Sequence, residues 1–370
     1  MDTLTREEIP PKPSRQSRSP VMPGLGLSGG AWFAGLVLLA FVLFILDIAV
    51  GPVHIPVKDI LRVIFGMEVD SVGAANIIGK IRIPKALTAV LAGSALASSG
   101  LLMQTLFRNP LAGPDVLGIT SGASLGVSLV MLASGTIPSI QSVKQTGILG
   151  GWIIVVAASL GSALVLLLVL AISVKVRDNA SLMIIGIMMG TLTISIVSLM
   201  LYLSSPEQIQ DYLMWTFGSI SGVTGRHLLT LFIVVAMGVS IALAASKPLN
   251  MLLIGENYAR SLGLSVFRSR LLIIIATCLL SGGITAFCGP IGFIGLAVPH
   301  LCRALLHTSD HLRLILASCV MGAIVVLACD IMSQLPGSRS LMPLNVMTAI
   351  IGAPVVIWVI ARAKHRKNLF

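Results

Sequence analysis

The sequence predicts an all-α integral membrane protein with about ten transmembrane helices. Of its 370 residues, 56% are hydrophobic and only 11% are charged, whereas a soluble domain carries about 25% charged residues. One span needs about 20 apolar residues, so the chain has room for about ten spans and short loops. The 36 glycines and 18 prolines indicate closely packed and broken helices. A large soluble domain is excluded.

Taken in order, residues 1–30 are polar and predict a disordered cytoplasmic tail. The first apolar run begins near Ala31, too late and too long for a cleaved signal peptide. The transmembrane domain covers 31–362, and 363–370 form a basic cytoplasmic tail. Spans are predicted at 31–50, 84–107, 115–135, 148–174, 181–203, 227–246, 270–288, 290–307, 314–332 and 344–362.

The distribution of basic residues predicts the orientation. With both termini in the cytoplasm, 17 of the 25 Lys and Arg residues lie on the inner side, as the positive-inside rule requires. The net charge of +11 is therefore attributed to Lys and Arg residues in cytoplasmic loops, and no nucleic-acid partner is predicted. Five basic residues break the rule by sharing one outer loop: Lys58, Arg62, Lys80, Arg82 and Lys85.

Two hairpins between spans are rich in Pro and Gly. RNPLAGPDVLG (108–118) joins spans 2 and 3 on the inside, and CGPIGFIGLAVPH (288–300) joins spans 7 and 8 on the outside. Breaks five spans apart on opposite faces indicate an inverted repeat, although two unrelated tight hairpins would give the same pattern. Asp115 is expected to cap the third span.

No catalytic or metal-binding constellation is found. The five cysteines lie in apolar runs without CxxC spacing. The loop GAANIIGKI (73–81) has five residues between its glycines, where a phosphate loop needs four. His307 and His311 are a helical pair without a third ligand nearby in the sequence, and buried acids are too few for a proton relay.

A polar stripe follows one face of the fifth span. Its members recur at helical spacing: Met188, Thr191, Ser195, Ser198 and Tyr202. The hydroxyls could simply bond to carbonyls of their own helix. The alternative is that the stripe forms a wall of a polar pathway with weak contacts.

The inner loop between spans 6 and 7, residues 247–268, contains a predicted short helix from Glu256 to Leu262. Gly263 is placed to end it, and Glu256 and Arg260 form a favourable i,i+4 pair. Leu253, Tyr258 and Leu262 could anchor the helix in a groove of a partner protein. A helix lying on the membrane surface is the alternative.

Three motifs, in this order, resemble the FecCD-type permeases. They are IRIPKALTAVLAGSALASSGLLMQTLFRNPLAGPDVLGITSGASLG (81–126), LLIGENYARSLGL (252–264) and CGPIGFIGLAVPHLCRALL (288–306). The family comprises membrane subunits of bacterial importers for iron–siderophore complexes, haem and cobalamin. The resemblance runs from about residue 50 to the C-terminus and leaves only the first 30 residues without a counterpart.

The resemblance implies a type II ABC importer permease fold, in which two permease subunits, identical or paralogous, enclose a central pathway. Two cytoplasmic ATPases bind ATP and Mg, so no cofactor and no catalytic residue is expected in this subunit, and a periplasmic or lipid-anchored binding protein delivers the substrate. The residues implied to couple to the ATPase are Leu253, Gly255, Glu256, Ala259, Arg260, Leu262 and Gly263.

The family's outer R-x-P-R motif, which meets acidic residues of the binding protein, stands here as Arg82-Ile83-Pro84-Lys85. Lys85 gives a point charge in place of a bidentate fork. Gln334 stands where the family usually has a third docking arginine, and Leu341-Met342 replaces its Glu-Leu before Pro343. Arg339 is the candidate substitute. Snorkelling at the membrane surface is the other explanation for this basic cluster.

The resemblance predicts a multi-pass permease of the bacterial cytoplasmic membrane that imports an iron–siderophore complex, with haem, cobalamin or molybdate as alternative cargo. A proton-coupled secondary carrier is the competing class, and the scarcity of buried acids and the coupling-loop motif disfavour it. An exporter or channel would work without a binding protein.

Overall fold

The computed structural model describes residues 29–51, 55–64, 67, 72–133, 148–173, 179–223, 225–334 and 342–367, and within these ranges every regular element is a helix. The predicted tail at 1–30 lies almost wholly outside them, as does Arg339. Long apolar segments become helices because lipid offers their backbone N–H and C=O groups no other partners.

Each of the ten predicted spans coincides with a helix. These are α1 (Gly29–Ala49), α4 (Ile83–Leu106), α5 (Ile119–Ala133), α7 (Ile148–Ser173), α8 (Asn179–Tyr202), α10 (Arg226–Ala244), α13 (Val266–Cys288), α14 (Ile294–Leu306), α15 (His311–Ser333) and α16 (Leu344–Lys367). By length and composition, seven are able to cross a membrane, and shorter apolar helices lie at 119–132, 294–306 and 344–357.

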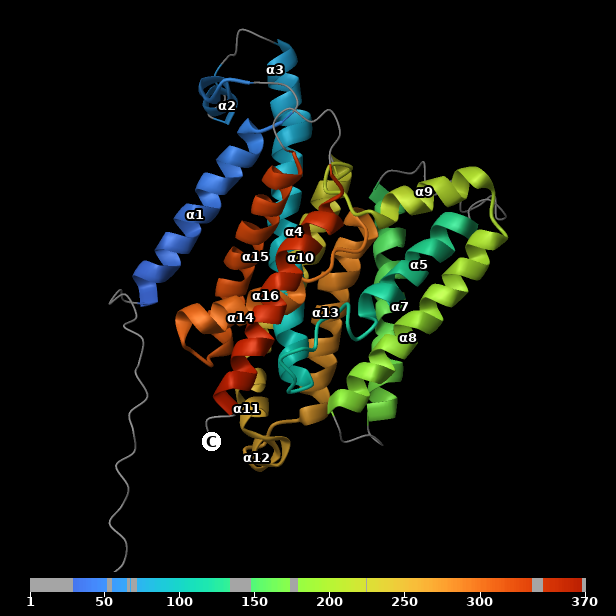
Figure 1. Cartoon of the computed structure of the whole chain (residues 1–370), viewed down its shortest axis with the longest axis vertical. Helices are drawn as coiled ribbons and strands as arrows, with labels where there is room; N and C mark the ends of the chain where they lie inside the picture. Colours follow the sequence, from blue (N-terminus) through green and yellow to red (C-terminus); the bar gives the residue numbers. More distant parts are fainter. Residues whose placement is uncertain are drawn as a thin grey trace, which may run out of the picture.

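Within the described residues, six further elements lie beside the spans, and of these only α12 is predicted from the sequence. They are α2 (Val57–Ile64), α3 (Val72–Ile77), the π-helical turn η1 (Ile78–Arg82), α9 (Pro206–Thr216), α11 (Ser246–Ile254) and α12 (Glu256–Ser261). Figure 1 shows α2, α3 and α9 at one end of the molecule and α11 and α12 at the other. We call these the α3 end and the α12 end.

Helix α4 is at the centre, packed against α13, α14 and α15. Small residues allow these backbones to touch: a Cβ atom on Gly93 would lie 2.1 Å from the carbonyl oxygen of Gly322, and one on Gly100 would lie 1.7 Å from that of Gly295. Close approach of this kind holds helices together in lipid, where burial of apolar side chains gives little driving force.

Helices α5, α7 and α8 form a second group at the side of the molecule (Figure 1). Small residues let α5 approach α7 closely, because a Cβ atom on Gly122 would be 2.4 Å from the carbonyl oxygen of Gly161. On α9, Ser205 and Gln208 form a reciprocal capping box, with Pro206 as the first helical residue.

Candidate functional site

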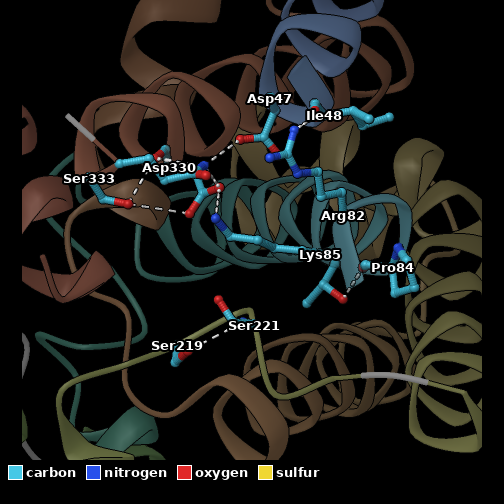
Figure 2. Close-up of polar contacts among 11 residues, drawn as sticks. Asp47, Ile48, Arg82, Pro84, Lys85, Ser219, Ser221, Asp330 and Ser333 are labelled. Carbon is cyan, nitrogen blue, oxygen red and sulfur yellow. Dashed lines mark hydrogen bonds and ion pairs between the residues drawn. The ribbon is translucent and has the colours of Figure 1, made fainter. Parts of the chain in front are cut away.

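A buried polar cluster lies at the α3 end, where α1, α4 and α15 meet (Figure 2). The Nζ atom of Lys85 lies 2.7 Å from Oδ2 of Asp330, and these side chains are only 10% and 4% exposed. The Oγ atom of Ser333 donates to the Asp330 carbonyl at 2.7 Å and to Oδ1 at 3.4 Å. The Lys85 ammonium group is therefore paired with a carboxylate of its own chain.

Gln334 joins the two acids of this cluster. Its Nε2 donates to Oδ2 of Asp330 at 2.8 Å and to Oδ1 of Asp47 at 3.2 Å. An amide can make both bonds without adding charge. The residue that departs from the family pattern is thus a bridge between α1 and the end of α15.

Arg82 closes the end of α1. Its Nη1 atom donates to the carbonyl oxygens of Ile48 at 2.7 Å and Ala49 at 3.1 Å. The last carbonyls of a helix lack partners within the helix and carry partial negative charge, so a cation is favourable there. Arg82 therefore has a structural role at the end of α1, in addition to the docking role that the family resemblance implies.

Arg82 and Lys85 are less exposed than a role in docking at the protein surface would require. Arg82 and Lys85 are 6% and 9% exposed, because acids and carbonyls from distant helices reach them. Lys58 and Lys80 are exposed at the same end. Docking by Arg82 and Lys85 stays a prediction, and it requires their present contacts to be released.

A cavity of about 180 Å³ opens beside the ion pair. Lys85, Asp330 and Ser333 line one side of it, and the segment after α9, with Ser219 and Ser221, lines another.

The predicted coupling helix is present at the α12 end. It runs from Glu256 to Ser261, and Gly263 follows it with φ +84°. Gly255 separates α11 from α12 with φ +145°, a conformation that only glycine adopts readily. The pair Glu256–Arg260 is formed at 3.9 Å, and Glu256 also pairs with Arg270 of α13.

Exposure divides the coupling residues into two groups. Ala259 is buried against the body of the protein, whereas Leu253, Tyr258 and Leu262 are about half exposed. The Arg260 side chain is 65% exposed. This segment therefore presents an apolar surface with one projecting cation, which suits insertion into a groove.

Arg108 and Asn250 also fix this segment to the rest of the chain. Arg108 donates through Nη2 to the Leu252 carbonyl at 2.8 Å. Asn250 donates to Oδ1 of Asp310 at 2.9 Å and accepts from the backbone N–H of His311 at 2.9 Å. The Asn250 bond holds the pKa of Asp310 below its usual value.

The α8 stripe is exposed along its length, and Tyr202 is 85% exposed. Thr191, Ser195 and Ser198 each donate to the carbonyl four residues earlier, at 2.9–3.0 Å. Val197, on the opposite face, is buried. The hydroxyls thus bond to their own helix, and the face of α8 that carries them stays uncovered by the described part of this subunit.

The two Pro- and Gly-rich hairpins meet inside the protein. Oδ2 of Asp115 accepts from the backbone N–H of Phe293 at 3.1 Å, and Oδ1 of Asn345 accepts from that of Gly292 at 3.2 Å. The expectation that Asp115 opens and caps the third span is wrong, because α5 begins only at Ile119 and the Asp115 carboxylate bonds to the second hairpin. Phe293 has φ +68°, which is strained for a bulky residue.

Comparisons with known proteins agree with this architecture. The model of the FecCD transport family matches residues 38–362. The vitamin B12 import system permease protein BtuC of Klebsiella pneumoniae is 34% identical over 337 residues, which is 90% of this chain and 95% of the relative. BtuC of Salmonella typhi is 32% identical over 334 residues, with the same coverage.

A solved structure, described as a metal-chelate type ABC transporter in an inward-facing conformation, superimposes with a TM-score of 0.74. It is 28% identical, and the match covers 90% of this chain and 99% of that one. The fold and these matches define the chain as the membrane-spanning permease subunit of an ABC importer. It belongs to the FecCD transport family.

Proposed function

We propose that this permease pairs with a second permease subunit and is driven by two ABC ATPases that bind at the α12 end, while a binding protein delivers cargo at the α3 end. The α12 end then faces the cytoplasm together with both termini. The inner location of 17 of the 25 basic residues supports this orientation. ATP and Mg belong to the ATPases, and this subunit contributes the path and the coupling segment.

The observation that carries the proposal is the exposed apolar surface of residues 253–262, which include α12, on a fixed base. Leu253, Tyr258 and Leu262 project, while the Arg108 and Glu256 contacts join the segment to the hairpin after α4 and to α13. A segment held in this way transmits a push or pull from the ATPase to the core helices. A helix that merely lay on the membrane would need no such clamps.

At the α3 end, we assign the first encounter with the binding protein to exposed Lys58 and Lys80. Exposed charges mainly set encounter rate and orientation. Arg82 and Lys85 would engage an acidic partner only after their internal contacts open, with Arg339 as a further candidate. Charge reversal at Arg82 also removes the cation at the end of α1, so it does not test docking alone.

The cargo we propose is a bulky metal chelate. A corrinoid is the first candidate, because the similar BtuC proteins are vitamin B12 import permeases at 32–34% identity. An iron–siderophore complex is the second candidate, supported by the likeness to a metal-chelate type transporter. The cargo would pass along the exposed α8 stripe between two subunits, where internally bonded hydroxyls offer only weak contacts.

Charge reversal at Arg260 tests the coupling proposal, and Arg313→Glu is the matched control. Both arginines lie at the α12 end, are 65% and 76% exposed, and face an acid at 3.9 Å. ATP-dependent uptake into proteoliposomes should be lost in Arg260→Glu and retained in Arg313→Glu, with ATPase stoichiometry reduced only in the former. Gly255→Pro would be a poorer test of coupling, because proline cannot adopt φ +145° and the variant would distort the backbone itself.

Equal uptake by both variants would exclude the coupling assignment. Uptake that an uncoupler abolishes and vanadate leaves intact would instead indicate a secondary carrier. Labelled cobalamin and a ferric siderophore, each supplied with its binding protein, distinguish the two cargo candidates.

A further inference from the structure

A second cavity, of about 280 Å³, lies at the α12 end. It forms where the end of α4 and the following hairpin meet α11, α14 and α15. Its polar lining residues are Gln104, Thr105, Arg108, Arg303, Ser309 and His311. The volume is several times the roughly 30 Å³ that one water molecule occupies in the liquid, so the cavity can hold a small polar group with its hydration.

The charge of this cavity is unbalanced. Arg108 and Arg303 line it, and no carboxylate is among the lining residues. Asp310, next to Ser309 in the chain, is held by Asn250 at 2.9 Å and lies 3.9 Å from Arg313. Within the described part of the chain, neither Arg108 nor Arg303 has an acidic partner within 4.0 Å.

Most donors of the two guanidinium groups are not used. A guanidinium carries five N–H donors. Arg108 bonds through Nη2 to the Leu252 carbonyl at 2.8 Å, and Arg303 bonds through Nη1 to Oε1 of Gln104 at 2.5 Å. These anchors fix the direction of each side chain, and in the described structure the remaining N–H groups make no other hydrogen bond.

His311 forms part of the wall and is not a ligand. Its Nδ1 lies 2.7 Å from Oδ1 of Asn250 and its Nε2 lies 2.8 Å from Oγ1 of Thr105. Because an amide oxygen only accepts, we assign the proton to Nδ1. Both ring nitrogens are therefore occupied, which leaves the two arginines and the Ser309 hydroxyl as the groups able to take a ligand.

We propose that this cavity binds a phosphate group through Arg108 and Arg303, with Ser309 as a hydroxyl donor. Guanidinium groups match phosphate oxygens in paired, charge-assisted hydrogen bonds, and a bound anion would balance the charge of the two arginines that line the cavity. Basic pockets at the cytoplasmic ends of transmembrane helices accept the headgroups of anionic lipids. The phosphate could thus belong to phosphatidylglycerol or to a soluble phosphate.

The position of the cavity gives binding a consequence for coupling. Leu253 belongs to its wall, and Arg108 holds the neighbouring Leu252 carbonyl. An anion that fixes Arg108 would therefore also fix the base of α12. This consequence rests on the proposed function, whereas phosphate binding itself does not.

Binding is tested on the full-length permease in neutral detergent. Native mass spectrometry measures retention of added phosphatidylglycerol against phosphatidylcholine, and thermal unfolding compares inorganic phosphate with chloride at equal ionic strength. Arg108→Gln and Arg303→Gln should each weaken binding about fivefold, and the double variant about 25-fold, from roughly 1 kcal/mol per basic residue. Arg268→Gln is the control, since Arg268 is exposed near α12 and outside the cavity.

The two ligands separate the sources: selective retention of phosphatidylglycerol without stabilisation by inorganic phosphate indicates a lipid, and stabilisation by inorganic phosphate indicates a soluble anion. Because Arg108→Gln also loses the Leu252 bond, Ser309→Glu provides a second test. A carboxylate placed there should occupy the arginines, so that neither ligand binds the variant while its own thermal midpoint is unchanged or higher. The proposal fails if neither ligand binds the wild-type protein, or if the double variant and the control bind alike.

Discussion

Lys85→Met should destabilise the permease by about 3 kcal/mol. Removing one partner of a buried ion pair costs about 3–5 kcal/mol, because the other charge stays buried without compensation. Lys85 and Asp330 are 2.7 Å apart and almost fully buried. Asp330 keeps Gln334 at 2.8 Å and Ser333 at 3.4 Å as donors, so we expect the lower end of that range.

A double-mutant cycle separates the pair from its surroundings. Lys85→Met combined with Asp330→Asn removes both charges and should return to within about 1 kcal/mol of the wild-type protein, since an uncharged pair avoids the cost of burial. Lys80→Met removes the same charge from an exposed position at the same end and should change stability by no more than about 0.5 kcal/mol.

The assay is reversible unfolding of the purified permease in mixed micelles, measured by loss of helical circular dichroism. The reasoning is refuted if Lys85→Met costs no more than Lys80→Met. That result would mean that Lys85 is solvated in the folded protein and available to an acidic partner at no energetic cost, as a surface docking role requires.

Three further predictions follow from burial and contact. After replacement of the native cysteines, cysteine at Ser195 should react with a water-soluble maleimide and cysteine at Val197 should not; equal rates would refute an open α8 face. Gly100→Ala places a methyl group 1.7 Å from a carbonyl oxygen of α14 and should lower the thermal midpoint strongly, whereas Gly79→Ala, with nothing within 4 Å, should not. The pKa of Asp310 is lower in the folded protein than in the unfolded chain, so its ionised form stabilises the fold at pH values above the unfolded pKa. This stability is lost as the pH falls through the folded pKa. The thermal midpoint of the wild-type protein should therefore fall further on acidification than that of Asp310→Asn.

The spans could be predicted because a single physical constraint produces them. About 20 apolar residues in lipid must satisfy their backbone within one helix, and each of the ten predicted segments contains a helix. The coupling helix was also predicted, since Gly263 and the pair of Glu256 with Arg260 are local signals. The helices α2, α3 and α11 are short or border a span, and hydropathy does not separate them. For α9 a signal was present in Ser205-Pro206-Glu207-Gln208.

The polar contacts at the α3 end could not be predicted in the same way. A cation in an outer loop can face solvent, lipid headgroups or a partner, and the sequence reasoning placed Arg82 and Lys85 at the surface. Their partners are Ile48 on α1 and Asp330 on α15, which are close only in the folded chain. Gln334 illustrates the same limit: its divergence from the family was visible, but its bond to Asp47 depends on how α1 packs.

The meeting of the two hairpins favours an inverted repeat over two unrelated turns. Non-helical backbone within a membrane is tolerated only where protein satisfies its N–H groups. Asp115 and Asn345 do so for Phe293 and Gly292, and a Cβ atom on Gly295 would lie 3.0 Å from Pro114 of the first hairpin. Breaks related by a two-fold axis in the membrane plane converge near that axis, whereas unrelated hairpins on opposite faces have no reason to meet. The strained Phe293 backbone is then stabilised by Asp115 from the first half of the chain. A displacement of one half would therefore disturb the backbone of the other half at this junction.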